Sequence, residues 1–284
     1  MSEATKIAPY LSENIFSEMI DLYEKVDWIK LKKKEINDLI NLCKSKDQFE
    51  VVKELVQSYL YICDIENRKN NSLRKIKEQI TDHWGLTPAD TRIVVKDIED
   101  KNDSSAAMQQ MIKPFFTGGG WRSAVNFPNK LASVIADKDA NNIVLIDDFS
   151  GTGKSLNKIL KWIEDKSIES DRKKLQVYAC FVGCMSETID SLDVSKICDL
   201  YFVFECKKGI SDKYEGKERV EKIKFMRELE KAHGNIAKRY SLGFKSSEAV
   251  FNFSDLNSPN NVFPIFWSDY SGSDIRPPFP RTPK

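Results

Sequence analysis

The sequence predicts an α/β protein with a largely parallel sheet flanked by helices and preceded by an N-terminal helical region. Three observations support this fold class. Apolar residues in the first ninety positions recur with helical spacing. Residues 143–146 form an uninterrupted apolar run, typical of a strand that is covered on both faces. From residue 142 onward, strand and helix patterns alternate, which implies right-handed crossovers on a parallel sheet.

Helical periodicity dominates residues 1–90. The apolar residues of 36–43, 52–63 and 73–84 recur at i, i+3, i+4 and i+7, so each range is predicted to be a helix with one buried face. The third helix should end near Gly85, because glycine favours helix ends. We therefore expect a helical region ahead of the sheet.

Residues 91–270 are expected to form the α/β domain. The predicted strands are rich in β-branched or aromatic residues, and they cover 92–98, 143–146, 176–182, 200–204, 249–253 and 262–267. The predicted helices cover 104–113, 129–136, 156–163, a segment capped by Ser186, and 218–233 with Val220, Ile223, Met226 and Leu229 inward. Residues 271–284 are rich in Pro and Ser and are expected to be a flexible tail.

Composition narrows the classes of function. Lys plus Arg (44) nearly cancels Asp plus Glu (43), which leaves a formal charge of +1. A protein that coats phosphates along a nucleic acid is normally more basic, so we expect nucleic acid to be contacted only through a partner. The chain has two histidines, too few for a multi-histidine metal centre.

The cysteine pattern and the hydropathy indicate a cytoplasmic protein. Six cysteines occur without a CxxC pair, mostly in apolar runs, and are expected to be reduced, buried thiols. The N-terminal residues lack a basic segment followed by an apolar one, so no signal peptide is expected. No apolar stretch approaches the ~20 residues that a membrane-spanning helix needs.

The segment IVLIDDFSGTGKSL, residues 143–156, carries the chemistry. Its apolar strand ends in Asp147 and Asp148, and a short turn then opens a helix; the turn residues are Gly151, Thr152, Gly153, Lys154 and Ser155. Ligands bind at the carboxyl ends of strands in open parallel sheets. A Gly- and hydroxyl-rich turn at a helix N-terminus favours phosphate, and carboxylates accept hydrogen bonds from sugar hydroxyls. The segment therefore predicts a site for a phosphorylated sugar or a nucleotide.

The alternative is the phosphate-binding loop of a P-loop NTPase, since TGKS ends as that motif does. The motif G-x-x-x-x-G-K-[ST] needs glycine five positions before Gly153, and position 148 is Asp. Acidic side chains where the loop begins to wrap phosphate are electrostatically unfavourable. This alternative would require ATP binding through Lys154.

The same segment resembles the phosphoribosyl pyrophosphate (PRPP) motif of type I phosphoribosyltransferases. The resemblance implies that Asp147 and Asp148 are catalytic residues that hold the ribose 2′- and 3′-hydroxyls, and that residues 151–155 bind the 5′-phosphate. Lys154 departs from the family, in which glycine is common at that position. A cation there should strengthen anion binding.

Two further segments, LGFKSSEAVFNF (242–253) and NSPNNVFPIFW (257–267), resemble the PRTase-CE family of bacterial conflict systems. That family also begins with helices that precede the sheet. The resemblance implies an antiviral context, such as the anti-phage loci that include some retrons. A reverse transcriptase or another defence-system protein would then be the partner.

The remaining site residues are candidates. Lys101, Ser104 and Ser105 are candidates for the pyrophosphate loop that the resemblance implies, and a solvated loop is the alternative. Acidic residues in that loop would oppose pyrophosphate unless Mg²⁺ intervenes, so we expect Mg²⁺ to be held through the ligand, with no protein residue ligating it directly. Candidates for stacking on a base are Phe263, Phe266 and Trp267, with a role in the core as the alternative.

The function expected from these features is binding of PRPP, or of a related ribose phosphate or nucleotide, with Mg²⁺. Pentosyl transfer (a glycosyltransferase reaction) or N-glycosidic or nucleotide hydrolysis would follow, depending on the acceptor. The second class is a module that senses a nucleotide or assembles with a defence complex without turnover. A loop that holds pyrophosphate would distinguish the enzyme from the binding module.

Overall fold

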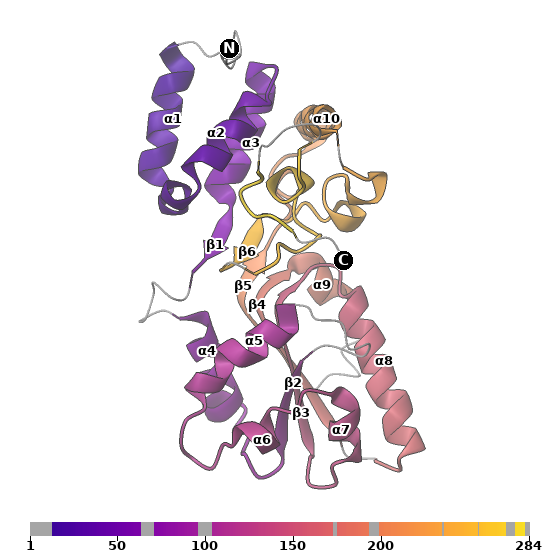
Figure 1. Cartoon of the computed structure of the whole chain (residues 1–284). Coiled ribbons are helices and arrows are strands. Elements are labelled where there is room, and N and C mark those ends of the chain that lie inside the picture. The colour runs from indigo at the N-terminus through magenta and orange to yellow at the C-terminus, as the bar shows by residue number, and fades with distance from the viewer. Residues whose placement is uncertain are drawn as a thin grey trace. The chain divides into compact units, whose positions relative to one another are not determined.

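The computed structural model describes residues 13–63, 71–95, 104–172, 175–192, 199–234, 236–254, 256–270 and 276–281. The chain divides into two compact units, one of residues 62–206 and one that combines residues 1–61 with 207–284 (Figure 1). These units have other bounds than the segments expected from the sequence, because the helix that begins at Ser72 belongs to the unit of the parallel sheet. None of the helices in the described ranges is long and apolar enough to cross a bilayer.

The unit of residues 62–206 is built on a parallel sheet. Its strands are β2 (Thr91–Val95), β3 (Asn142–Ser150), β4 (Gln176–Met185) and β5 (Asp199–Cys206), in the order β2-β3-β4-β5. All three pairings are parallel, and Ile146 is opposite Val95 on one side and Cys180 on the other. The predicted α/β fold with a parallel sheet flanked by helices is confirmed.

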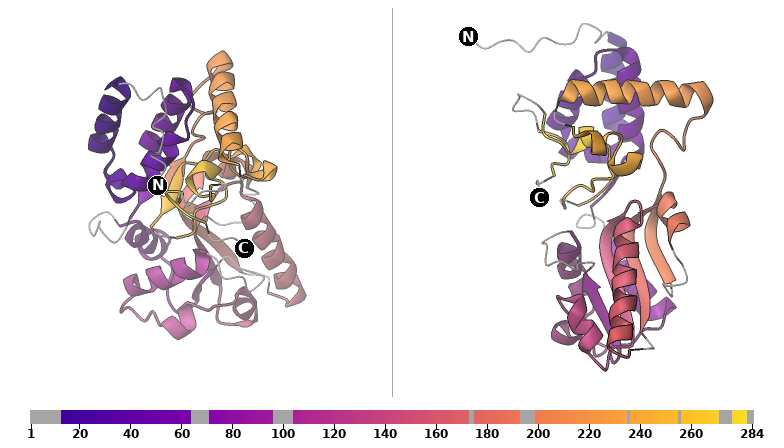
Figure 2. Two further views of the ribbon diagram at one scale, coloured as in Figure 1. Left: turned by 45° about the horizontal axis from the view of Figure 1, so that its top comes forward. Right: turned by 90° about the vertical axis from the view of Figure 1, so that its right-hand side faces the viewer.

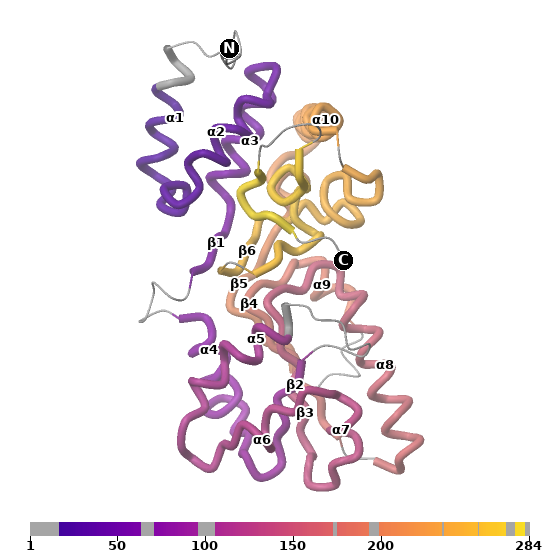
Figure 3. Tube along the Cα trace, in the orientation of Figure 1, coloured from indigo at the N-terminus to yellow at the C-terminus, as the bar shows by residue number. Residues whose placement is uncertain are grey.

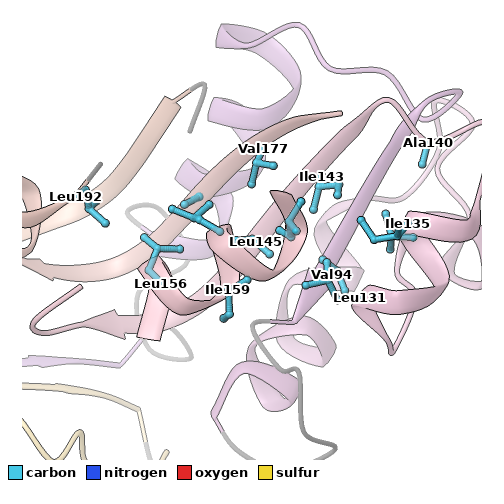
Figure 4. Close-up of a cluster of buried hydrophobic side chains, with 14 of the residues drawn as sticks. Val94, Leu131, Ile135, Ala140, Ile143, Leu145, Leu156, Ile159, Val177 and Leu192 are labelled. Atoms are coloured by element: carbon cyan, nitrogen blue, oxygen red, sulfur yellow. The ribbon is translucent and has the colours of Figure 1, made fainter. Parts of the chain in front are cut away.

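Helices pack on both faces of this sheet. On one face, α7 (Leu131–Ala136) and α8 (Lys154–Glu169) share a buried cluster with the strands, to which Leu145, Ile159 and Val177 contribute (Figure 4). Tyr178 follows Val177 and points to the other face, where it contacts Trp84. That face is packed by α4 (Ser72–Glu78) on β4 and β5 and by α5 (Ser104–Ile112) on β2 and β3.

Short elements complete this unit. They are η2 (Gln79–His83), η3 (Lys113–Phe115), α6 (Ser123–Asn126) and α9 (Ser186–Ser191). The helix before Gly85 ends as predicted, with Gly85 at a φ of +66°. The helix α5 ends before Pro114, which also matches the prediction.

The second unit is helical with a small sheet. Its elements are α1 (Glu13–Lys25), η1 (Asp27–Leu31), α2 (Lys33–Asn41), α3 (Lys46–Ser58), β1 (Leu60–Ile62), α10 (Gly216–His233), η5 (Lys238–Tyr240), η6 (Phe244–Ser246), β6 (Phe251–Phe253) and η7 (Pro264–Phe266). The strands β1 and β6 pair although they are far apart in the chain (Figure 3). The helices α3 and α10 pack against each other (Figure 2).

Several local predictions differ from the structure. The second predicted helix ends at Ser58, because the chain becomes extended at Tyr59 and enters β1. Residues 262–267 do not form a strand, because Pro264 lacks an N–H and starts the turn η7. Val220 is 63% exposed and not inward. Ser186 is the first residue of α9 and not its cap, since its hydroxyl donates to Glu205 Oε1 at 2.7 Å.

The described part of the C-terminal segment, residues 276–281, also differs from a flexible tail. Phe279 is 4% exposed and stacks on Tyr59, with 4.8 Å between ring centroids and 15° between ring planes. The Phe279 N–H donates to Phe266 O at 2.9 Å. These contacts hold the segment in the core of the second unit.

Candidate functional site

The acid pair lies within the carboxyl-terminal part of β3. The sequence predicted a strand that ends at Ile146, but β3 continues to Ser150, because β4 is long enough to pair with it through Cys184. Asp147 is 4% exposed and Asp148 is 3% exposed. The Asp148 N–H donates to Asp147 Oδ1 at 3.0 Å. Two carboxylates are therefore buried at the end of a parallel strand where such sheets bind ligands.

A tight turn connects β3 to α8. Gly153 precedes the first helical residue, Lys154, with a φ of +66°, a conformation that favours glycine. A Cβ at Gly153 would also lie 2.8 Å from Ser191 Oγ. The helix begins with a hydrogen bond from Asn157 N to Gly153 O at 2.8 Å. Both backbone conformation and space thus require glycine at position 153.

Hydroxyls of α9 bind the carbonyls of this turn. Thr188, which is fully buried, donates from Oγ1 to Gly151 O at 2.6 Å and also lies 3.2 Å from Ser150 O. Ser191 Oγ lies 3.4 Å from Thr152 O. Three successive carbonyls of the turn therefore face α9, and the turn is fixed from one side.

This arrangement directs the N–H groups of the turn to the other side. In a trans peptide the C=O and the following N–H point in opposite directions, and the described residues contain no cis peptide. The N–H groups of residues 151–153 therefore point away from α9. Within the described ranges, the N–H groups of residues 152–156 donate no hydrogen bond. Unpaired donors at the positive end of a 16-residue helix favour an anion such as phosphate.

Exposed polar side chains flank these donors. Lys154 and Ser155, the first two residues of α8, are both exposed. The turn thus combines backbone donors with one cation. The buried acids are not part of the turn, because they follow Ile146 directly and the second of them is three positions before Gly151. The two parts suit different groups of one ligand, an anion at the turn and hydroxyls at the acids.

The donor set fits Mg²⁺ bound through a ligand. The described residues contain no group of three or more His, Cys, Asp or Glu side chains that could hold a metal ion. Mg²⁺ usually keeps several of its waters and binds substrate phosphates, so it can be held without a cluster of protein ligands.

None of the other candidate residues belongs to this turn. Lys101 is outside the described residues, and Ser104 and Ser105 are the first two residues of α5. Phe263 and Phe266 are fully buried in the second unit, so neither ring is open to a base. Trp267 is in the same unit, and its indole N–H donates to Val262 O at 2.9 Å.

Two thiols of the sheet, Cys180 and Cys206, are not suited to nucleophilic chemistry. Cys180 and Cys206 are free and buried. Burial raises the pKa of the Cys180 thiol well above its usual value, and it raises the pKa of Cys206 to about 12. Both thiols therefore stay protonated at neutral pH, which leaves them poor nucleophiles.

Sequence reasoning missed the residues of α9 that fix the turn. Thr188 and Ser191 are three positions apart, so a helix places them on one face. Hydroxyls with this spacing directly after the next strand are the only signal in the sequence. Their role depends on the pairing of β3 with β4, which the sequence does not specify residue by residue.

Replacing Thr188 by Val is expected to lower the free energy of unfolding by about 1–2 kcal/mol, because the buried Gly151 carbonyl loses its donor. Urea unfolding measures this loss of stability. Thr188→Ser keeps the hydroxyl and is the matched control; equal stability of the Val variant and the wild type would contradict this role.

Comparison with families of known proteins shows to which family the chain belongs. Searches of curated proteins and of solved structures found no match to this chain. A model of the PRTase-CE family, in contrast, matches residues 23–281. The matched range contains the acid pair, the turn and the helices α2, α3 and α4, which precede the sheet. Since it covers nearly the whole chain, the protein belongs to the PRTase-CE family and is phosphoribosyltransferase-like.

Proposed function

We propose that this protein binds PRPP, or a closely related ribose 5-phosphate compound, together with Mg²⁺. The turn of residues 151–155 would bind the 5′-phosphate, and Asp147 and Asp148 would accept hydrogen bonds from the ribose hydroxyls. The observation that carries the proposal is the fixing of the turn by α9, which directs successive N–H groups away from Thr188 and Ser191. Family membership supports the same ligand class.

The chemistry that follows is pentosyl transfer. The bond from ribose C1′ to the pyrophosphate oxygen breaks with its electron pair leaving on pyrophosphate, and a base or water forms the new bond to C1′. The carboxylates of Asp147 and Asp148 would stabilise the positive charge that develops on the ribosyl ring. Bound Mg²⁺ would neutralise charge on the leaving group. With water as the acceptor, the same site would hydrolyse its ligand.

Turnover is tested by release of pyrophosphate. Purified protein with PRPP and Mg²⁺ should release pyrophosphate in the presence of a suitable purine or pyrimidine base, or slowly with water alone. The Asp147→Asn/Asp148→Asn variant should release none. PRPP binding without release under any of these conditions would support the non-catalytic module that senses a nucleotide or assembles with a partner.

Lys154→Ala is expected to weaken PRPP binding by about two- to tenfold, because one exposed cation beside the phosphate contributes roughly 1 kcal/mol. The loss should shrink as the salt concentration rises. Calorimetric titration measures both, with the exposed residue Lys161, changed to Ala, as the control. Undiminished PRPP binding by Lys154→Ala would contradict a role for this cation, and ATP binding that is abolished by the change would favour the P-loop alternative.

We propose further that the protein acts in the cytoplasm of a bacterium as part of an anti-phage system. Its partner would be a reverse transcriptase of a retron or another protein of such a system. The resemblance to families of conflict systems supports this context, and the cysteines in the described ranges, all of them free, suit a reducing compartment. Loss of phage protection in cells that carry the acid-pair variant, with protection retained in cells that carry the wild type, tests the proposal.

A further inference from the structure

A groove of ≈ 750 Å³ runs along α10, and it is lined by Ser211 and by side chains from Arg219 to Lys231. At 1.5 Å per residue, this stretch of helix is about 18 Å long, or slightly more than three turns. Met226 and Leu229 are buried on another side of the helix, where α10 packs in its own unit. The groove therefore lies beside the buried face of α10 and is not part of the core.

The groove has an apolar floor. Val220 is 63% exposed, and Ile223 is half-buried. The helical spacing of Val220, Ile223, Met226 and Leu229 predicts that all four are inward, but only the last two are buried in this unit. Val220 and Ile223 thus extend the apolar stripe of α10 beyond the surface that its own unit covers.

The groove is also strongly basic. It is lined by four cations and one carboxylate, namely Arg219, Lys224, Arg227, Lys231 and Glu228. Lys224 pairs with Glu228 at 3.9 Å. Within the described ranges, Arg219, Arg227 and Lys231 form no ion pair. These lining residues carry an excess of three positive charges on one side of one helix, whereas the whole chain carries a formal charge of only +1.

We propose that this groove docks an acidic amphipathic helix of a partner protein. Leucine-like side chains of the partner would cover Val220 and Ile223, and its carboxylates would face Arg219, Arg227 and Lys231. The length of the groove suits a helix of about three to four turns, which binds through residues at i, i+3, i+4 and i+7. A single-stranded nucleic acid fits less well, because none of the described residues that line the groove is an aromatic on which bases could stack.

A synthetic helical peptide tests the docking directly. The probe carries leucine at i, i+3, i+4, i+7 and i+11 and glutamate elsewhere, with a fluorescent label. Polyglutamate of the same length and a labelled oligo(dT) are the comparison ligands. Fluorescence anisotropy should show micromolar binding of the peptide, at least tenfold weaker binding of the other two, and a steady loss of affinity with added NaCl.

Two variants test the floor and the charge separately. Val220→Asp should weaken peptide binding at least tenfold, as should Arg219→Glu combined with Arg227→Glu. The matched controls should change it less than twofold: Ile168→Asp replaces an aliphatic residue of α8 that is 75% exposed, and Lys34→Glu with Lys161→Glu makes the same change in net charge at two other exposed positions. Thermal melting followed by circular dichroism confirms that each variant is folded.

Three results would overturn the proposal. The first is the same loss of peptide binding in the controls as in the groove variants. The second is tighter binding of oligo(dT) than of the peptide, which would assign the groove to nucleic acid. The third is a dimer of this chain that Val220→Asp converts to a monomer. No PRPP is present in these measurements, so their outcome is independent of the proposed catalytic function.

Discussion

Replacing Asp147 and Asp148 together by asparagine is expected to reduce the affinity for PRPP and ribose 5-phosphate by about 100-fold or more. Each hydrogen bond to a charged group contributes roughly 1.5–3 kcal/mol, and the double change removes both charges. The fold should persist, because the asparagine at position 147 keeps an oxygen that can accept from the N–H of residue 148. Calorimetric titration measures the affinity, and thermal melting measures the stability.

An adjacent acid pair elsewhere in the same unit provides the control. Glu164 and Asp165 are exposed residues of α8, and Glu164→Gln/Asp165→Asn makes the same change in net charge. This control should bind PRPP as the wild type does. If the Asp147→Asn/Asp148→Asn variant also binds as tightly as the wild type, the acid pair does not hold the ribose.

Gly153→Ala is expected to weaken PRPP binding at least tenfold and to destabilise the fold by about 2–4 kcal/mol. A side chain at a φ of +66° costs roughly 1 kcal/mol. The Cβ would also lie 2.8 Å from Ser191 Oγ, so that either α9 or the turn must move. Movement of the turn displaces the N–H groups that would bind the phosphate. Urea unfolding and calorimetric titration measure the two effects.

Gly85 gives a matched control for the backbone strain. It has the same φ of +66°, but nothing lies within 4 Å of a Cβ at that position. Gly85→Ala should therefore cost about 1 kcal/mol of stability and leave PRPP binding unchanged. Adding Ser191→Ala to Gly153→Ala should restore part of the lost affinity by making room. Equal effects of the two glycine variants on binding would contradict the role of the contact with Ser191.

Much of the fold follows from local pattern. The apolar run of residues 143–146 predicts a strand covered on both faces, and α7, α8, α4 and α5 cover both faces of the sheet. Helical spacing locates α2, α3, α4 and α10. These elements form where sequence preference and burial agree.

The deviations arise where distant segments meet. Tyr59 fits a helical stripe, yet its ring packs on Phe279 and Phe266, and its hydroxyl donates to Phe251 O at 3.3 Å. Those partners are about 190 to 220 positions away in the chain, so local spacing contains no sign of them. Val220 fits the stripe of α10 as well, but its own unit provides no surface that covers it.

The candidate site could be predicted only in part, because some of its features are local in the sequence and others depend on distant segments. Residues 147–155 are contiguous, and their order alone predicts acids followed by a phosphate-binding turn. The length of β3 past Ile146 and the bracing of the turn by Thr188 depend on β4 and α9. Phe263 and Phe266 were candidates for base stacking because aromatic sequence alone does not distinguish a core ring from an exposed one; burial in the second unit does.

The central claim is a ribose-phosphate site at the end of β3, and calorimetric titration tests it most directly. Wild-type protein and the Asp147→Asn/Asp148→Asn variant are titrated with PRPP, ribose 5-phosphate and ATP, each with Mg²⁺. We expect the wild type to bind PRPP and ribose 5-phosphate and the variant to bind neither. Absence of binding to both compounds by the wild type, with ATP bound through Lys154, would contradict the claim.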